Sequence, residues 1–211
     1  MMSLPIDHLA YATNDLEATV ADLTERLGVA PAPGGAHDGM GSRNYLLSLG
    51  PACYLEIIGP DPDQPEPAQP RPFGIDDLDG PRLMSFAVTA TGIDSVVAGA
   101  RQRGHDPGDP MAMSRTTPAG DRLAWTLTRA GSGDDTCDGL VPFLIDWGDT
   151  AHPATVTPTG CTLRALHGYH PEVEKVRDAL EALGVEIAVA RHPEPHLLAI
   201  IDTPNGPVEL G

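Results

Sequence analysis

Residues 5–28, PIDHLAYATNDLEATVADLTERLG, describe a strand that leads directly into a helix. The first nine residues alternate as a strand does. From Asn14 onward the apolar residues recur at helical spacing, and Asn14 with Glu17 forms a capping-box pattern. Gly28 is typical of a helix end. This stretch therefore predicts a strand and a helix that begins at Asn14.

Two further strands are predicted after this helix. They are residues 43–50, RNYLLSLG, and residues 53–59, CYLEIIG, joined by a tight Gly-Pro turn. The intervening residues 31–44, PAPGGAHDGMGSRN, contain four glycines, and we expect them to form a loop over the mouth of a cleft. Residues 1–59 are accordingly interpreted as a β-α-β-β-β unit.

The same pattern returns twice along the chain. Gly28, Gly104 and Gly184 each follow an amphipathic segment, and they are spaced by 76 and 80 residues. The repeat predicts a second unit at residues 83–150 and a third, similar unit at residues 160–211.

Linkers separate these units, namely residues 60–82, which are rich in proline, and residues 151–159. A single helix covers only one face of its sheet, so the other face must curl around something. We therefore expect an α+β fold in which repeated units form a half-open, mixed-sheet barrel with the helices outside. The concave faces would enclose a cleft for a small-molecule ligand.

The composition excludes several classes of partner. The 211 residues carry a net charge of −17 with only 13 Lys and Arg, which argues against nucleic acids and anionic membranes. No stretch approaches the length of a membrane-spanning helix, and no secretory signal is apparent. The three cysteines lie far apart in the sequence. These features favour a reduced, cytoplasmic protein.

Glu56 is the most unusual residue of the opening unit. Strand geometry places it on one face with Tyr54 and Ile58, so a solvated surface position does not explain it. An unpaired buried carboxylate is costly. It could have a partner such as Arg43 on a neighbouring strand, act as a general base without a metal, or bind a metal together with His8 of the opening strand.

Three motifs carry a resemblance to a known family. They are IDHLAYATNDLEATVADLTERLG at residues 6–28, YLEIIG at residues 54–59 and IDTPNGPVELG at residues 201–211. With the repeated units, they resemble the vicinal oxygen chelate superfamily, and within it the glyoxalase-like domain proteins of the glyoxalase, bleomycin-resistance and dioxygenase types.

This resemblance implies a divalent metal ion, which could be Fe, Mn, Ni, Co or Zn. His8 and Glu56 match the family's metal-binding half, and Glu209 matches the glutamate of its closing hairpin. A metal held this way is a Lewis acid for a substrate that chelates it through adjacent oxygens. The implied activity is that of a metal-dependent lyase, isomerase or dioxygenase, with Glu56 as a catalytic residue as well.

The other units match this metal-binding pattern only partly. Alignment of the helix starts places Ser85 of the second unit and Arg164 of the third unit opposite the histidine. The place of the glutamate falls on either Ile145 or Asp146 in the second unit. Together with Tyr54, the residues Ser85, Asp146 and Arg164 are the candidate substrate contacts.

Two arrangements of the units stay open. If the first and second units share a cleft, His8 and Glu56 are the two certain ligands. If the first and third units share it, the set becomes His8, Glu56 and Glu209, and Arg164 would suit a substrate carboxylate or carbonyl. The alternative to an enzyme is a non-catalytic protein that sequesters a ligand, and an acidic chain would suit a cationic one. The third unit could also serve to form a homodimer.

Overall fold

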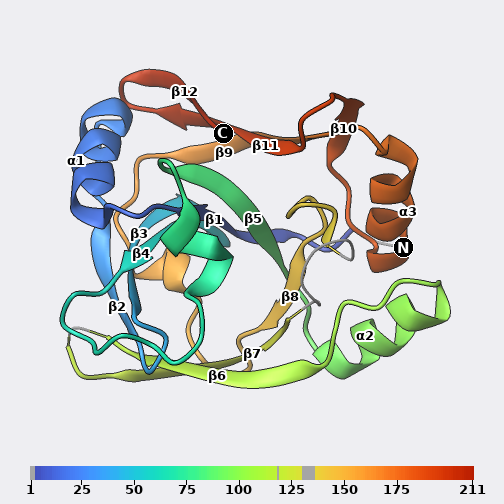
Figure 1. Ribbon diagram of the computed structural model, residues 1–211, viewed down its shortest axis with the longest axis horizontal. Coiled ribbons are helices and arrows are strands. Elements are labelled where there is room, and N and C mark those ends of the chain that lie inside the picture. The colour runs from blue at the N-terminus through green and yellow to red at the C-terminus, as the bar shows by residue number, and fades with distance from the viewer. Residues whose placement is uncertain (1–2, 118, 130–135) are drawn as a thin grey trace.

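The computed structural model describes residues 3–117, 119–129 and 136–211. Eight strands form a closed barrel in the order β1-β4-β3-β2-β6-β7-β8-β5, and four more form a separate sheet in the order β10-β9-β11-β12 (Figure 1). The three α-helices lie outside the barrel strands (Figure 1). The predicted α+β class is therefore confirmed.

The elements repeat in the order β-α-β-β-β. The first set is β1 (Ile6–Ala12), α1 (Leu16–Leu27), β2 (Ala32–His37), β3 (Ser42–Gly50) and β4 (Cys53–Pro60). The second set is β5 (Arg82–Thr89), α2 (Ile93–Gln102), β6 (Pro110–Thr116), β7 (Arg122–Thr128) and β8 (Phe143–Asp146). The third set is β9 (Thr162–His170), α3 (Val173–Leu183), β10 (Ala188–Arg191), β11 (His196–Thr203) and β12 (Gly206–Leu210). Short 3₁₀ turns occupy Pro72–Asp77 and Pro153–Thr155 between the sets.

The start of α1 differs from the prediction by one residue. Asp15, not Asn14, caps the helix, because the Asp15 side chain accepts a hydrogen bond of 3.1 Å from the Ala18 N–H. The Asn14 amide donates instead to Leu78 O, in the linker between the first and second sets of elements. Gly28 ends the helix in the left-handed conformation, as expected.

Strand β2 replaces part of the predicted loop at residues 31–44. It pairs with β3 along its length and meets β6 at Ala36 and Thr116. Gly34 permits this close packing, because a Cβ there would collide with the Asn44 side chain. The pairing of β2 with β6 and of β1 with β5 closes the barrel, which the sequence predicted as half-open.

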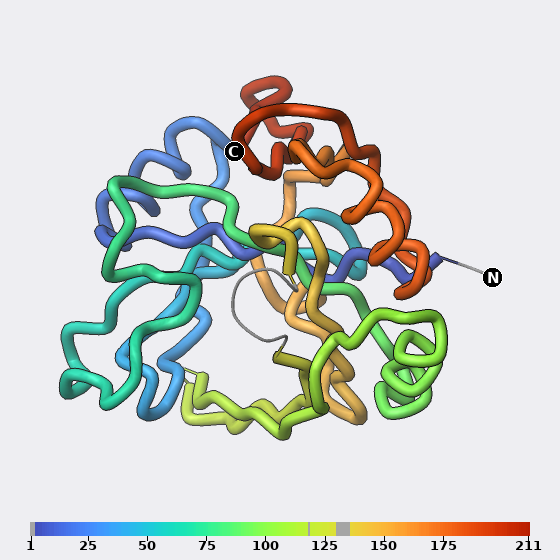
Figure 2. Tube along the Cα trace, turned by 45° about the vertical axis from the view of Figure 1, so that its right-hand side comes forward, coloured from blue at the N-terminus to red at the C-terminus, as the bar shows by residue number. Residues whose placement is uncertain are grey.

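The third set of elements adds no strand to the barrel. Its sheet and helix, orange to red in Figure 2, lie along the outside of the ring formed by the first two sets. Leu166, Leu197 and Ile201 of this sheet belong to the same apolar core as Leu9 and Phe86 of the barrel. Of the two arrangements left open, the first and second units are the pair that forms the barrel around the cleft, and the third unit contributes Pro195, His196 and Gly211 to the cleft lining.

No helix in the described part of the chain is long and apolar enough to cross a membrane.

Candidate active site inside the barrel

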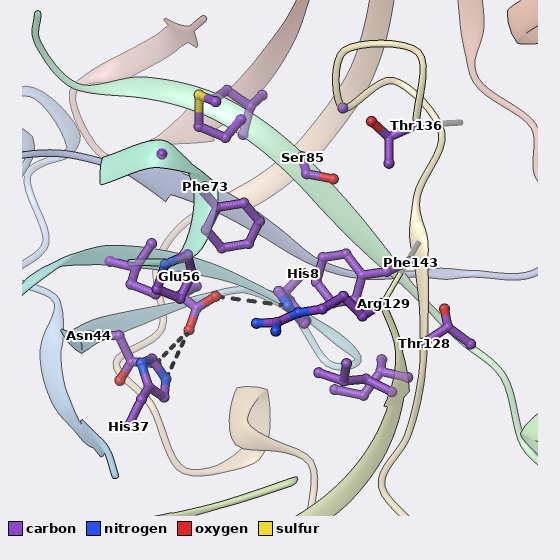
Figure 3. A pocket seen from close by; sticks show the side chains of 18 of the residues that line it. His8, His37, Asn44, Glu56, Phe73, Ser85, Thr128, Arg129, Thr136 and Phe143 are labelled. Carbon is purple, nitrogen blue, oxygen red and sulfur yellow. Dashed lines mark hydrogen bonds and ion pairs between the residues drawn. The ribbon is translucent and has the colours of Figure 1, made fainter. Parts of the chain in front are cut away.

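The barrel encloses a cavity of about 740 Å³ lined by both of its halves. This size is typical of small-molecule sites. Apolar side chains such as Met113, Trp125, Leu127 and Phe143 form much of the wall contributed by the second half. The first half contributes a polar cluster of His8, His37, Asn44 and Glu56 (Figure 3).

Glu56 projects into the cavity from β4, where the strand alternation also turns Tyr54 and Ile58 inward. Its Oε1 accepts a hydrogen bond of 2.6 Å from Nδ2 of Asn44 on β3. Its Oε2 lies 4.0 Å from Nε2 of His8 on β1 (Figure 3). The structure thus brings together the pair that the sequence predicted, and adds Asn44 as the partner in place of Arg43.

His37 of β2 completes the polar cluster around Asn44. Its Nε2 lies 3.2 Å from Asn44 Nδ2 and 3.7 Å from Glu56 Oε1, and its Nδ1 lies 3.0 Å from Ser42 Oγ. Burial lowers the pKa of His37, although the charge of Glu56 acts in the opposite direction. In the neutral ring, Nε2 accepts from Asn44 and Nδ1 donates to Ser42. One amide group therefore donates to both Glu56 and His37.

Asp7 orients the His8 ring through Nδ1, whereas Nε2 is the ring nitrogen nearer Glu56. The Asp7 carboxylate is fully buried, and its Oδ1 lies 2.8 Å from His8 Nδ1. Thr89 Oγ1, Trp147 Nε1 and His152 Nε2 approach the other oxygen, Oδ2, at 2.8, 3.1 and 3.2 Å. Burial by itself would raise the pKa of Asp7, but the hydrogen bonds from His152 and His8 outweigh it and hold the pKa well below 3.8.

The ionised Asp7 fixes the proton of the His8 ring. Since this carboxylate can only accept, Nδ1 of His8 donates to it, and Nε2 faces Glu56. Tyr54 stacks on the ring with centroids 4.7 Å apart, which holds its plane. Burial raises the pKa of Tyr54 well above 10.0, with Glu56 adding to the effect, so the phenol stays protonated.

Ser85 is the predicted residue of the second half that does line the cavity. It lies on β5, where it pairs with Ala10 of β1. Asp146, by contrast, does not line the cavity. Its carboxylate accepts hydrogen bonds from the Gly92 and Ile93 N–H groups at the start of α2 and from the Gly148 N–H just after β8. The ambiguity of one residue resolves in favour of Ile145, which lines the cavity.

The structure does not bring Arg164 and Glu209 to the cavity. Arg164 lies on β9 of the outer sheet, where it pairs with Asp202. Glu209 is exposed on β12, and its backbone oxygen accepts a hydrogen bond from Arg26. Arg43 points away as well, towards Glu17 at 2.8 Å.

A resident metal ion requires more ligands than His8 and Glu56. At the positions that match His8 and Glu56, the second half of the barrel presents Ser85 and Ile145, neither of which is a strong metal ligand. No group of three or more His, Cys, Asp and Glu side chains in the described chain is placed to hold one ion. In addition, Asn44 already engages Glu56 Oε1. The donor set therefore does not fit a resident divalent metal.

Three arginines that the sequence did not connect with a site also line the cavity. They are Arg82, Arg115 and Arg129. The cavity lining also contains two carboxylates, Glu56 and Asp138. The acidic chain thus has a cavity with more cationic than anionic side chains, contrary to the idea of a cationic ligand. Alternation along β7 identifies its inward face, and on β6 the inward residues Met111, Met113 and Arg115 likewise occur at every second position.

Comparison with known proteins places this barrel in a family. The family model described as a glyoxalase-like domain matches residues 6–184. The chain belongs to the glyoxalase-like domain family. The match confirms the predicted resemblance to the vicinal oxygen chelate superfamily, whose members commonly use a divalent metal.

Several solved structures are similar to this chain at low sequence identity. A hypothetical protein from Staphylococcus aureus is 14% identical with a TM-score of 0.65, covering 97% of this chain and 83% of that one. A methylmalonyl-CoA epimerase from Mycobacterium tuberculosis is 18% identical with a TM-score of 0.45, covering 70% and 91%. A Streptomyces coelicolor epimerase of the same name, in complex with 2-nitronate-propionyl-CoA, is 20% identical with a TM-score of 0.44, covering 70% and 97%. None of the curated proteins matches the chain.

Proposed function

We propose that this glyoxalase-like protein is an enzyme that moves a proton on a small molecule bound in the barrel, with Glu56 as the general base. One observation carries the proposal. Asn44 holds Oε1 of Glu56, whereas Oε2 receives no hydrogen bond from any described residue and lines the cavity. A carboxylate anchored through one oxygen and free at the other is oriented to accept a proton.

His8 adds a second proton carrier 4.0 Å from Glu56. Because Nδ1 of His8 donates to Asp7, its Nε2 is left to accept a proton from Glu56 or from the substrate and to return it. The Asp7–His8 pair resembles the arrangement in which a buried carboxylate orients a catalytic histidine.

The reaction that suits these groups is proton removal from a carbon next to a carbonyl. Glu56 takes the proton, and the electrons of the C–H bond pass to the carbonyl oxygen as an enolate forms. Return of the proton to either face or to a neighbouring atom gives an isomerised product. Arg129, whose guanidinium extends into the cavity in Figure 3, would stabilise the charge on oxygen. The step needs no group beyond these side chains.

A non-catalytic protein that sequesters a ligand is the second candidate. The apolar wall of Met111, Met113, Trp125 and Phe143 favours it, because flexible methionines and aromatic rings adapt to varied ligands. Such a protein would bind without exchanging protons.

Proton exchange measured by ¹H NMR in D₂O tests the proposal. The probes are 2-oxohexanoate, its methyl ester and 2-hexanone, each with hydrogens next to a carbonyl. Both tryptophans of the chain, Trp125 and Trp147, line the cavity, so their fluorescence reports binding independently. We expect deuterium incorporation above the buffer rate with at least one probe that also changes the fluorescence. Binding without exchange by every probe would support sequestration and contradict the enzyme.

A further inference from the structure

Arg115 of β6 is a buried cation with no carboxylate partner. Arg115 is only 4% exposed to solvent, and its side chain lines the cavity. The structure gives its guanidinium one hydrogen bond, from Nη1 to Gly34 O. No ion pair joins Arg115 to any Asp or Glu in the described residues, whereas the exposed Arg101 pairs with both Asp106 and Asp109.

A buried guanidinium in this state is energetically unfavourable. Desolvation of the charge is costly, and only one of its five N–H donors is used. Burial accordingly lowers the pKa of Arg115, against the influence of Tyr54 and Glu56. An anion placed against the guanidinium would supply both the missing charge and acceptors for the remaining donors.

The surroundings of Arg115 place this binding group beside the acid–base cluster. Its Nη1 lies against Gly34 of β2, three residues before His37, which in turn lies 3.7 Å from Glu56. On its own strand, Arg115 is flanked at alternate spacing by the inward Met113, which belongs to the apolar wall. A ligand held at Arg115 can therefore present one part to Glu56 and another to apolar side chains.

We infer that Arg115 is the receptor for a carboxylate group of the substrate, and that the substrate class is a small carboxylic acid with an apolar body. This inference rests on the proposed function only in taking the cavity as the substrate site. Arg115 is then a specificity-determining residue. The competing explanation is that Arg115 only fastens β6 to β2 through Gly34 O.

The dissociation constants of 2-oxohexanoate and its methyl ester distinguish these explanations. The two probes differ in charge and are similar in shape, and the fluorescence of Trp125 and Trp147 follows both. We expect the parent protein to prefer the acid by about 10-fold or more, as for a charge-assisted, bidentate contact. Arg115→Gln should abolish this preference.

The matched control is Arg122→Gln. Arg122 is exposed on β7, donates to Ser114 Oγ and does not line the cavity, so its loss removes the same charge without the contact. Its ratio of dissociation constants should equal that of the parent. Arg115→Lys retains the charge and loses the planar fork, and we expect an intermediate ratio.

Two results would overturn the inference. The first is a parent protein that binds the ester as tightly as the acid. The second is an unchanged preference in Arg115→Gln, with a lowered melting temperature as the sole effect, which is the behaviour of a structural fastener. If Arg115→Gln does not fold, Arg115→Lys takes its place. A ratio of dissociation constants in Arg115→Lys equal to that of the parent would also overturn the inference. If the acid binds in an Arg115-dependent manner but exchanges no deuterium, the proposed proton transfer is overturned, whereas Arg115 as the receptor for the carboxylate is supported.

Discussion

Asn44 and Glu56 face the cavity from adjacent antiparallel strands, joined by a hydrogen bond of 2.6 Å from the Asn44 amide to Glu56 Oε1. They are diagonal neighbours, since Leu46 pairs with Glu56 and Asn44 pairs with Ile58. The same amide nitrogen lies 3.2 Å from His37 Nε2. The orientation of the proposed base therefore depends on one neutral side chain.

Loss of this amide should slow the reaction more than it weakens binding. We expect Asn44→Ala to lower the rate of deuterium exchange by about 10-fold, because a hydrogen bond to a charged group is lost and Glu56 can rotate. The fluorescence-derived dissociation constant should change little. Asn14→Ala is the control, because it also removes one amide hydrogen bond, to Leu78 O, outside the cavity. Equal exchange rates for the two variants would show that Asn44 does not position the base.

Gly34→Ala should destabilise the barrel through Asn44. An added Cβ would collide with Asn44 Oδ1 and lie 2.9 Å from Leu46 Cγ, while the backbone of Gly34 is not in the left-handed region. The cost is therefore steric, and we expect a loss of about 1–3 kcal/mol in the free energy of unfolding by urea. At Gly80 an added Cβ would meet nothing within 4 Å, and its φ is not positive either. Gly80→Ala should consequently be close to neutral, and equal losses at both sites would contradict the packing described.

Asp7 should give the protein a stability that disappears in acid. Its pKa in the folded chain is depressed below the ordinary value of 3.8, so the unfolded chain takes up a proton first as the pH falls. The contribution is fully present above 3.8 and is lost progressively below it. We expect Asp7→Asn to cost about 3 kcal/mol at neutral pH, because it breaks a buried charged network.

Urea unfolding between about pH 7 and pH 3 measures this effect. The difference between parent and Asp7→Asn should narrow at the acid end. Asp22→Asn on the exposed face of α1 serves as the control, and it should give a small difference throughout. A gap between parent and Asp7→Asn that stays constant or widens in acid would refute the linkage.

Chelation should leave the activity intact. The donor set around Glu56 does not fit a resident metal, so exchange rates before and after dialysis against EDTA should agree. Elemental analysis after incubation with Mn, Fe, Ni, Co or Zn and desalting should find less than one ion per chain. Retention of one ion per chain, lost in His8→Ala, together with loss of activity on chelation, would restore the metal-dependent mechanism.

The resemblance to the glyoxalase-like proteins was sufficient to predict that His8 and Glu56 lie close together, because it places them on the opening and closing strands of one unit. The sequence could not predict β2 and β6. Gly34 and Gly35 lie in β2, where a glycine-rich segment is typical of a loop, and a strand is recognisable there only through its partners. These two strands close the barrel, and they carry His37 and Arg115.

The sequence also could not predict contacts between segments that are far apart along the chain. The partners of Asp7 are an example, because Trp147 and His152 lie about 140 residues away in the sequence. The choice between Ile145 and Asp146 depended on the register of the strand, because a shift of one residue turns a side chain from one face of a strand to the other. Asn44, in contrast, was accessible in principle, since strand alternation separates it from Tyr45, Leu47 and Leu49, which form the apolar face of β3.

The most direct test of the central claim is the exchange rate of Glu56→Gln. This change keeps the shape of the side chain and removes its basicity, and Glu209→Gln makes the same chemical change on the exposed outer sheet. We predict that Glu56→Gln lowers the rate by about 100-fold or more while the probe still binds, and that Glu209→Gln matches the parent. An exchange rate in Glu56→Gln within about threefold of the parent would contradict Glu56 as the base.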